Sequence, residues 1–325
     1  MRAIVFDTPG REEVLKLAEV PAPKLGPDEI RIRVRATAVN RADLLQRQGM
    51  YPPPPGASEL LGLECAGEVI EIGPGVTDWH VGDRAMALLA GGGYAEEVAV
   101  HHGSAMPVPE ALSFEEAGAL PEVYLTAFLN LFLLGEIAEG QSALVHGGGS
   151  GVGTASIQLL RESGVKVIVT AGSAAKCQRC LDLGADVAIN YREGDFAAAA
   201  RSATGGRGVD VVLDSIGGKY LASNLDSLAV GGRLVIIGLI GGAQAQINLA
   251  AVLMRRLRII GSTLRARSVA EKAEIVAHFR QRFGPAIAAG RVKPIVDCVL
   301  PLAEAEEAHR IMQASTHFGK IVLRV

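Results

Sequence analysis

The feature that most restricts the fold of this chain is the glycine-rich segment ALVHGGGSGVGTASIQLL at residues 143–160. It joins an apolar, strand-like run to an amphipathic, helix-like run. Gly149, Gly151 and Gly153 carry no Cβ, so backbone N–H groups at the positive end of the following helix can approach a pyrophosphate. Thr154 stands where a strict G-x-G-x-x-G motif has its third glycine, and no Gly-Lys-Ser/Thr follows. The segment therefore predicts a dinucleotide-binding turn and not a P-loop.

Strand-like and helix-like runs alternate from this segment onward. Buried strands between amphipathic helices predict a parallel, doubly wound sheet with right-handed crossovers. Strands are expected at 143–147, 165–172, 187–191, 209–217, 231–241 and 258–264, and helices at 153–163, 173–184, 194–203 and 219–229. The fold class predicted for this part of the chain is therefore α/β.

The two ends of the chain show a different pattern. Short runs rich in β-branched residues, separated by Pro and Gly turns, fill the first ~120 residues and predict a compact β domain. A single helix is expected over 113–134, with Ser113 and Glu116 in capping-box spacing. The last ~60 residues mix helical and strand-like patterns. The simplest architecture places a doubly wound domain, 121–265, within a β-rich domain made from 1–120 and 266–325.

The end of the second strand of the alternating region indicates which cofactor would bind. An NAD enzyme usually has Asp or Glu there, to accept a hydrogen bond from the ribose 2′-hydroxyl. Here Ala171, Gly172 and Ser173 follow one another, with Lys176 and Tyr191 nearby in the sequence. A hydroxyl and a lysine without a carboxylate favour a 2′-phosphate and therefore NADPH. The alternative is that Ser173 only caps a helix and Lys176 is a solvated side chain.

Composition excludes several other classes of protein. The net charge is −3, the pI is about 6.2 and aromatic residues make up 4%, so no nucleic-acid partner is expected. No apolar run approaches the ~20 residues that span a bilayer, and the N-terminus lacks signal-peptide features. A cytoplasmic protein without membrane association is the resulting expectation. The four cysteines do not suggest a disulfide framework, and Cys177 and Cys180 are interpreted as helical thiols one turn apart.

Several long motifs carry a family resemblance over essentially the whole length. They are AVNRADLLQRQGMYPPPPGAS at 38–58, LGLECAGEV at 61–69, GDRAMALLAGGGYAEEVAV at 82–100, LPEVYLTAF at 120–128, HGGGSGVGTASIQL at 146–159, TAGS at 170–173, INY at 189–191 and GKIVL at 319–323. With these motifs the chain resembles the zinc-free quinone oxidoreductase branch of the medium-chain dehydrogenase/reductase superfamily. The resemblance implies a GroES-like catalytic domain, an inserted Rossmann domain that binds NADPH in the interdomain cleft, and a homodimer.

The resemblance also assigns roles to particular residues. Asn40 and Tyr51 would line the substrate side, and Ser150 is a third catalytic candidate, although a role in the turn is favoured for it. The expected cofactor-binding residues are Thr126, Gly149, Ser150, Gly151, Val152, Gly153, Ser173, Lys176, Tyr191, Gly238, Leu239, Ile240, Leu264 and Arg265, with Arg267 a weaker candidate. For Tyr51 two hypotheses stay open: that its hydroxyl donates a proton to the acceptor, and that it only shapes the pocket.

No metal is expected. Zinc-binding members of the superfamily use a Cys and a His where this chain has Asn40 and Leu63, and residues 84–108 contain no cysteine. Asn and Leu cannot replace thiolate and imidazole ligands. Without a Lewis acid the acceptor must delocalise negative charge itself, which favours quinones and other electrophilic carbonyl compounds.

Two other functions remain open on the sequence. The first is NADPH-dependent reduction of the double bond of a 2-alkenal, an enone or an enoyl thioester, for which the same fold and cofactor would serve. The second is a non-catalytic role as a structural or RNA-binding protein, which the low aromatic content and the complete cofactor turn disfavour. The segment GGRLVIIGLIGG at 231–242 is expected at the edge of the sheet, as a dimer seam.

Overall fold

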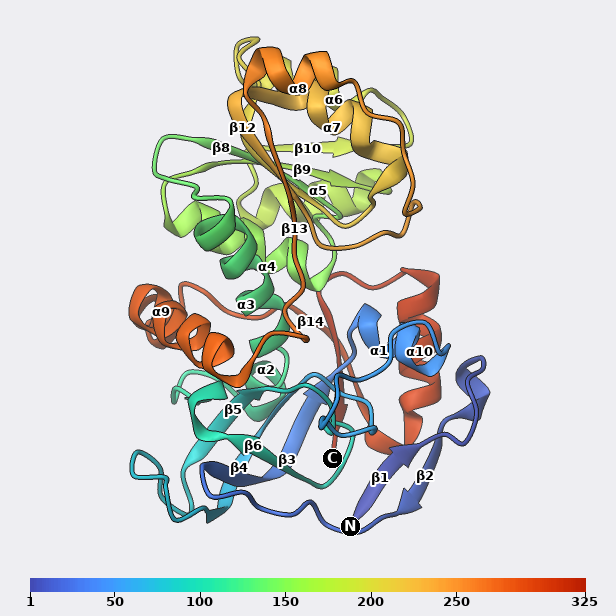
Figure 1. The fold of residues 1–325 in the computed structure, drawn as a ribbon, viewed down its shortest axis with the longest axis vertical. Helices are drawn as coiled ribbons and strands as arrows, with labels where there is room; N and C mark the ends of the chain where they lie inside the picture. Colours follow the sequence, from blue (N-terminus) through green and yellow to red (C-terminus); the bar gives the residue numbers. More distant parts are fainter. The chain divides into compact units, whose positions relative to one another are not determined.

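The computed structural model describes residues 1–325 and contains two compact units. One consists of Met1–Leu125 and Leu264–Val325, and the other of Thr126–Thr263. Figure 1 shows the first unit in blue to teal and in orange to red, and the second in green to orange. The boundaries expected from the sequence lie after residues 120 and 265. Helix α3 (Pro121–Phe128) runs through the first division, so no loop marks it.

A six-stranded, wholly parallel sheet forms the centre of the unit Thr126–Thr263. Its order is β10-β9-β8-β11-β12-β13. The strands are β8 (Ser142–His146), β9 (Lys166–Ala171), β10 (Val187–Asn190), β11 (Val209–Asp214), β12 (Leu228–Ile236) and β13 (Arg258–Gly261). The chain therefore starts in the middle, moves outward through β9 and β10, and then crosses to β11, which is the doubly wound order of dinucleotide-binding sheets. The predicted α/β fold is confirmed.

The helices of this unit begin and end at residues whose local chemistry explains the boundary. They are α4 (Gly151–Glu162), α5 (Ala174–Leu183), α6 (Phe196–Ala203), α7 (Leu221–Ser227) and α8 (Leu249–Arg255). Asp195 caps α6 by accepting hydrogen bonds from the N–H groups of Ala197 and Ala198. The predicted end of α5 at Gly184 is confirmed, since this residue adopts a φ of 113°, which favours glycine.

The other unit is built on an antiparallel-rich sheet of seven strands. Its order is β14-β15-β3-β4-β5-β7, with β6 paired to β3, and a separate ribbon joins β1 to β2. The strands are β1 (Arg2–Val5), β2 (Lys16–Glu19), β3 (Glu29–Ala38), β4 (Glu64–Ile72), β5 (Arg84–Leu88), β6 (Glu97–His101), β7 (Ala105–Pro107), β14 (Val296–Pro301) and β15 (Lys320–Arg324). Strand β15 pairs with β3, so the last residues of the chain complete a sheet that the first residues begin.

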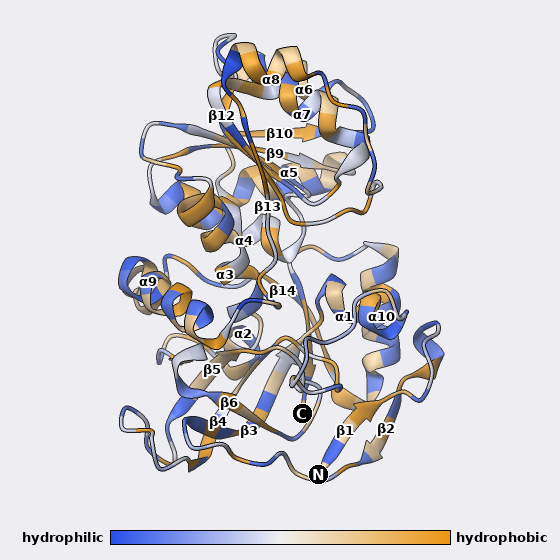
Figure 2. Ribbon diagram, in the orientation of Figure 1, coloured by the Kyte–Doolittle hydropathy of each residue, from blue (hydrophilic) through white to orange (hydrophobic).

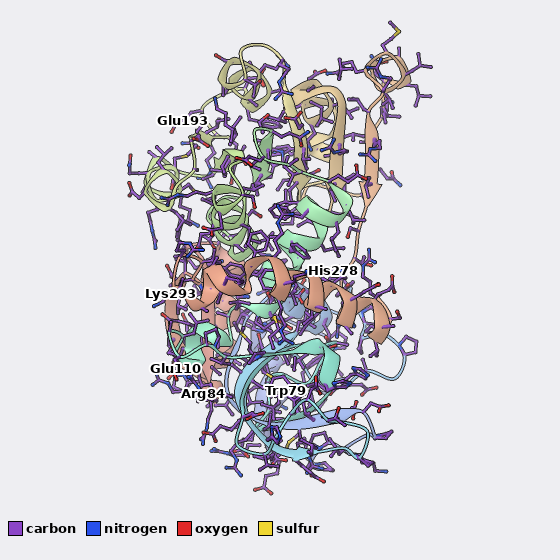
Figure 3. All side chains as sticks on the ribbon, turned by 90° about the vertical axis from the view of Figure 1, so that its left-hand side faces the viewer. Trp79, Arg84, Glu110, Glu193, His278 and Lys293 are labelled. Carbon is purple, nitrogen blue, oxygen red and sulfur yellow. The ribbon has the colours of Figure 1, made fainter.

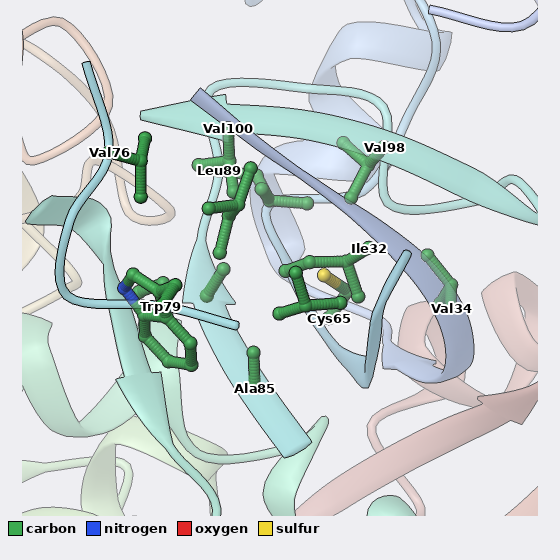
Figure 4. Close-up of a cluster of buried hydrophobic side chains, with 13 residues drawn as sticks. Ile32, Val34, Cys65, Val76, Trp79, Ala85, Leu89, Val98 and Val100 are labelled. Atoms are coloured by element: carbon green, nitrogen blue, oxygen red, sulfur yellow. The ribbon is translucent and has the colours of Figure 1, made fainter. Parts of the chain in front are cut away.

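The core of this unit follows the alternation of strand β3. Ile30, Ile32 and Val34 are buried, whereas the arginines between them lie on the other face. Trp79, which Figure 3 labels, packs in the same cluster with the side chains shown in Figure 4. The helices are α1 (Arg41–Arg47), α2 (Phe114–Ala117), α9 (Val269–Ala288) and α10 (Ala305–Ala314). Helix α9 mixes hydrophobic and hydrophilic residues, as the colours of Figure 2 show, and buries its apolar side.

The prediction of a single helix over residues 113–134 is wrong. The capping box of Ser113 and Glu116 is present, but helix α2 ends at Ala117. A second helix, α3, starts at Pro121, and a π-helical segment, η3, covers Leu129–Leu134. A Cβ on Gly118 would lie 2.7 Å from the carbonyl oxygen of Ala36, so the chain bends where it crosses β3. Pro121 also lacks the N–H that would continue the first helix.

The expected edge position of residues 231–242 is also wrong. Strand β12 lies inside the sheet, because β13 pairs with it in parallel register from Arg233↔Arg258 to Ile236↔Gly261. The edges are β10 and β13. None of the helices combines the length and the apolar composition that a bilayer-spanning segment requires.

Candidate functional site

The glycine-rich turn connects β8 to α4, and two of its glycines, Gly148 and Gly153, have no room for a side chain. Gly147 has a φ of 72°, and a Cβ on Gly148 would lie 2.8 Å from the Cβ of Val169. A Cβ on Gly153 would lie 2.7 Å from the carbonyl carbon of Gly148. Ser150 closes the turn, since its Oγ accepts a hydrogen bond from the N–H of Gly153 at 3.0 Å. The segment thus presents the N-terminus of α4 as an anion-binding end, as a pyrophosphate requires.

A buried histidine supports this turn from inside the unit. His146 Nε2 lies 2.6 Å from Asn224 Oδ1, which only accepts, so Nε2 carries the proton and Nδ1 accepts from the hydroxyl of Thr170 at 3.0 Å. Thr170 Oγ1 in turn accepts from the N–H of Gly147 at 3.3 Å. Burial lowers the pKa of His146 to about 4, so the ring is neutral at neutral pH. No partner for His146 is evident in the sequence, because Thr170 and Asn224 are far from it along the chain.

The residues expected to contact a 2′-phosphate lie together after β9. Ser173 Oγ accepts a hydrogen bond from the N–H of Lys176 at 3.2 Å and caps α5, so the helix-capping role considered for Ser173 is present. Tyr191 N–H donates to the carbonyl of Ala171 at 3.1 Å. A Cβ on Gly172 would lie 2.7 Å from the hydroxyl oxygen of Tyr191. The hydroxyl of Ser173 and the phenol of Tyr191 therefore lie at the end of β9, and Lys176 lies in the first turn of α5. None of the residues Ala171, Gly172 and Ser173 is acidic.

The remaining cofactor candidates of this unit lie on neighbouring segments. Gly238, Leu239 and Ile240 follow β12, where the N–H of Ile240 donates to the carbonyl of Ser215 at 3.3 Å. Leu239 and Ile240 are exposed. Since the carboxyl ends of parallel strands share one edge, this loop lies on the same edge as the glycine-rich turn. Thr126 accepts a hydrogen bond through its carbonyl from Asn130 Nδ2 at 2.8 Å.

The other unit contains a buried polar network that includes Asn40. Asn40 Nδ2 donates to Glu64 Oε1 at 2.8 Å, and its Oδ1 accepts from Lys320 Nζ at 2.7 Å. Lys320 and Glu64 form an ion pair at 2.8 Å with side chains 3% and 0% exposed. The three residues come from the end of β3, the start of β4 and the start of β15. The side-chain amide of Asn40 is thus held in one orientation, but Lys320 and Glu64 were not predicted as site residues.

A second buried carboxylate continues the network. Asp43 accepts from the N–H groups of Asn40 at 2.8 Å and Gly62 at 3.0 Å, and from the hydroxyl of Tyr94 at 3.3 Å. Tyr94 also lies 3.2 Å from Nε2 of the buried His309. Burial raises the pKa of Asp43 to about 6, against the two backbone hydrogen bonds. The carboxylate therefore fixes helix α1 to the loop that precedes Glu64.

Arg265 holds the loop that carries Tyr51. Its guanidinium donates to the carbonyls of Ala90 at 2.8 Å and Tyr51 at 3.3 Å, and to Gln46 Oε1 at 2.7 Å. Leu264 and Arg265 are both buried. The resemblance assigns both to the cofactor, but the hydrogen bonds of Arg265 go to the loop that carries Tyr51 and to its surroundings. Burial raises the pKa of the Tyr51 phenol, and the charge of Arg265 opposes this shift.

The donor set of this unit does not fit a zinc ion. Asn40 is occupied by Glu64 and Lys320, and Leu63 has no donor atom. No group of three or more His, Cys, Asp or Glu residues in the structure is arranged to hold a metal. The side chains that converge near Asn40 and Tyr51 are instead hydrogen-bond donors and charged groups, which can orient an oxygen-bearing substrate.

A doubly wound sheet with a glycine-rich first turn, joined to an antiparallel-rich unit with a buried polar site, defines a dinucleotide-dependent oxidoreductase fold. Residues 26–110 match the model for the alcohol dehydrogenase GroES-like domain, and residues 151–279 match that for zinc-binding dehydrogenases. The chain belongs to the medium-chain dehydrogenase/reductase superfamily, as the sequence resemblance predicted. Quinone oxidoreductase from Rattus norvegicus is 34% identical over 99% of this chain and 97% of that protein.

Solved structures agree with this assignment. Quinone oxidoreductase from Escherichia coli, complexed with NADPH, has a TM-score of 0.88 at 31% identity and covers both chains completely. An NAD-dependent alcohol dehydrogenase has the same TM-score at 35% identity, also over both full chains. The enoyl reductase of CurK has a TM-score of 0.86 at 28% identity, over 99% of this chain and 98% of that chain. The fold is therefore shared by relatives with different acceptors.

Proposed function

We propose that the protein transfers hydride from NADPH to a quinone or another electrophilic carbonyl acceptor without a metal ion. The observation that carries the proposal is the combination of the glycine-rich turn at Gly147–Gly153, where Gly148 and Gly153 have no room for a side chain, with a buried polar site around Asn40 whose side chains do not suit zinc. NADPH would supply the hydride. The turn would bind the pyrophosphate, and the polar site would hold the acceptor oxygen.

The preference for NADPH over NADH rests on charge at the end of β9. Ser173, Lys176 and Tyr191 would offer two hydroxyl groups and an ammonium to a 2′-phosphate, and none of the residues Ala171 to Ser173 at this strand end is acidic. The similar quinone oxidoreductase from Escherichia coli is complexed with NADPH, whereas another similar structure is that of an NAD-dependent enzyme. The local side chains favour the first of these.

The acceptor class rests on the side chains where zinc-binding relatives have their metal ligands. Asn40 cannot act as a Lewis acid, so an alkoxide formed from a simple ketone or aldehyde would lack stabilisation. A quinone delocalises the incoming charge over its ring. The amide of Asn40 would orient the acceptor, and the hydroxyl of Tyr51 would donate a hydrogen bond to its oxygen. In this proposal Ser150 has no chemical role, because its Oγ already caps α4.

A second candidate is reduction of the carbon–carbon double bond of an enone, a 2-alkenal or an enoyl thioester. The similarity to the enoyl reductase of CurK supports it. The same hydride donor would serve, and charge would develop on the oxygen of a conjugated carbonyl group. The two candidates differ in which bond of the acceptor is reduced, and not in the cofactor.

Cofactor oxidation with several acceptors separates these functions. Purified protein would be mixed with NADPH or NADH and with 1,2-naphthoquinone, 1,4-benzoquinone or a 2-alkenal, with and without a chelator. We expect chelator-insensitive quinone reduction with a preference for NADPH. Turnover of the alkenal alone would assign double-bond reduction instead. No turnover with any acceptor would contradict both, and RNA binding measured over a range of salt concentrations would then test the non-catalytic alternative.

The expected homodimer is proposed to form through strand β13 and not through residues 231–242. β13 is an edge strand with unpaired backbone groups, and Ile259 on it is exposed. Leu249, Leu253 and Met254 on helix α8 of the same unit are exposed as well. A second copy of the chain would cover this apolar surface. Light scattering that gives one chain's mass, 33.9 kDa, at micromolar concentration would contradict the dimer.

A further inference from the structure

One residue of the polar network, Glu122, has a buried carboxyl oxygen without a hydrogen-bond partner. It is the second residue of α3, and its backbone N–H donates to Glu64 Oε2 at 2.9 Å. The residue is therefore anchored to the network through its main chain. Its side-chain Oε2, however, is shielded from solvent and has no hydrogen-bond partner. A buried carboxylate oxygen without a donor is costly, whereas the neutral acid is tolerated.

Charged groups from four elements surround Glu122. Glu64 on β4 and Asp43 on α1 are negative neighbours, and Lys320 on β15 and Lys272 on α9 are positive ones. Burial, followed by the charge of Glu64, raises the pKa of Glu122 to about 8, while Lys320 and Lys272 act in the opposite direction. The carboxyl group of Glu122 is thus mostly protonated at neutral pH, and its pKa lies within about one unit of neutrality.

Tyr51 and Arg265 lie within electrostatic reach of the same carboxyl group. A negative charge on Glu122 raises the pKa of the Tyr51 phenol, in addition to the effect of burial. The same charge raises the pKa of the Arg265 guanidinium group, against the lowering by burial. Glu122 thus acts electrostatically on the loop that carries Tyr51, and its backbone is linked through Glu64 to Asn40, which is proposed to orient the acceptor. A phenol whose pKa lies above its ordinary value is a poor proton source at neutral pH, whereas an acid that titrates near the working pH is a good one.

We propose that Glu122 supplies the proton that completes reduction of the acceptor, with Tyr51 orienting the acceptor by a hydrogen bond. This role rests on the hydride transfer proposed above. Hydride from the reduced nicotinamide dinucleotide gives a quinone two electrons and leaves one acceptor oxygen negative. The O–H bond of Glu122 then breaks, and a new O–H bond forms on that oxygen. Water returns a proton to the carboxylate, which Lys320 and Lys272 stabilise meanwhile.

The decisive variant is Glu122→Gln. Glutamine keeps the size of the side chain and the N–H that binds Glu64, but it has no acidic proton. At pH 7 we expect kcat with NADPH and a quinone to fall about 100-fold, the range for loss of a general acid, with KM within about twofold. In the wild type, kcat should fall about tenfold per pH unit above pH 8, and this limb should vanish in the variant. Glu122→Asp should recover part of the rate.

A measurement on the protein without cofactor tests the protonated state directly. Infrared difference spectra should show a protonated-carboxyl band that titrates near pH 8 in the wild type and is absent from Glu122→Gln. Glu110→Gln is the matched control, because Glu110 is exposed and labelled at the periphery in Figure 3. This control should keep the band, the rate and the pH profile.

The outcomes separate this inference from the proposed function. If the wild type reduces quinones but Glu122→Gln retains kcat and the alkaline limb, Glu122 is not the proton source. If the infrared band is missing from the wild type, the carboxyl group holds no proton and the inference is overturned as well. If none of the tested acceptors supports oxidation of NADPH by the wild type, the proposed function itself fails. The inference about Glu122 then fails with it, whatever the infrared spectra show.

Discussion

Arg265 lies over the ring of Tyr51, with its guanidinium carbon 5.3 Å from the ring centroid, and also donates to the carbonyl of Tyr51. A single side chain thus fixes both the backbone and the ring of the residue proposed to contact the acceptor. Its remaining hydrogen bonds attach this arrangement to Gln46 and Ala90. The planar guanidinium group is suited to this task because it presents several donors in fixed directions.

Arg265→Lys should therefore loosen the Tyr51 loop although the charge is kept. Lysine has a single ammonium group and cannot reach the three acceptors of the guanidinium group, so about 1–3 kcal/mol of unfolding free energy should be lost. KM for the quinone should rise more than kcat falls. Denaturant unfolding and steady-state kinetics measure both. Arg310→Lys is the control, because this half-exposed arginine pairs at the surface with Glu12, Glu306 and Glu307 and should change stability little. Equal effects of the two variants would contradict the loop-holding role.

Lys176→Ala should weaken NADPH binding without affecting NADH. A charge-assisted contact to the 2′-phosphate is worth about 1.5–3 kcal/mol, so Kd for NADPH should rise at least tenfold. Fluorescence titration with both cofactors gives the two Kd values, and NADH serves as the internal control because it has no 2′-phosphate. A parallel loss for both cofactors would show that Lys176 acts on the fold of α5 and not on the phosphate.

His146 should make stability depend on pH on the acid side. Its pKa is about 4 in the folded protein and 6.5 in the unfolded chain, so the unfolded state binds the proton first on acidification. The contribution of the neutral ring is complete above pH 6.5 and is lost as the pH falls to 4, by about 3 kcal/mol. His146→Gln should flatten this part of the curve of unfolding free energy against pH. The exposed His80 is the control, and the same flattening in His80→Gln would refute the assignment.

Lys320→Met should destabilise the protein strongly. The substitution leaves Glu64 as a buried charge without its partner, which costs about 3–5 kcal/mol. Lys320→Met combined with Glu64→Leu removes both charges and should recover part of this loss. Urea unfolding of the two single variants and the double variant measures the coupling. If the double variant is no more stable than the sum of the single losses predicts, the ion pair is not the source of the effect.

Local sequence patterns allowed much of the unit Thr126–Thr263 to be predicted. Apolar strands, the capping residue Ser173 and the helix-ending Gly184 each depend on neighbours a few residues away. The break between α2 and α3 could not be predicted in the same way, because the close approach of Gly118 to Ala36 is a contact between distant segments. The predicted position of residues 231–242 at the edge of the sheet was wrong for a related reason. Only the pairing of β12 with β13, which is a contact between separate segments, places β12 inside the sheet.

The candidate site shows the same limit. Asn40 and Tyr51 lie in recognisable motifs, but their partners do not. Lys320 lies 280 residues from Asn40 along the chain, and no spacing rule connects them. Glu122 looks in the sequence like an ordinary acid in the first turn of a helix, where carboxylates are common. Its unusual environment comes from packing against Glu64 and is visible only in three dimensions.

The hydroxyl of Tyr191 lies where a side chain at position 172 would begin, so cofactor preference at this strand end depends on both positions. An aspartate at position 172, which would suit NADH, needs the space that the phenol occupies. A mutation there alone would displace Tyr191 before any new hydrogen bond to a ribose could form. Because Tyr191 is 40% exposed, its ring has room to turn towards solvent, so an acidic residue at position 172 would also move the phenol proposed to contact the 2′-phosphate.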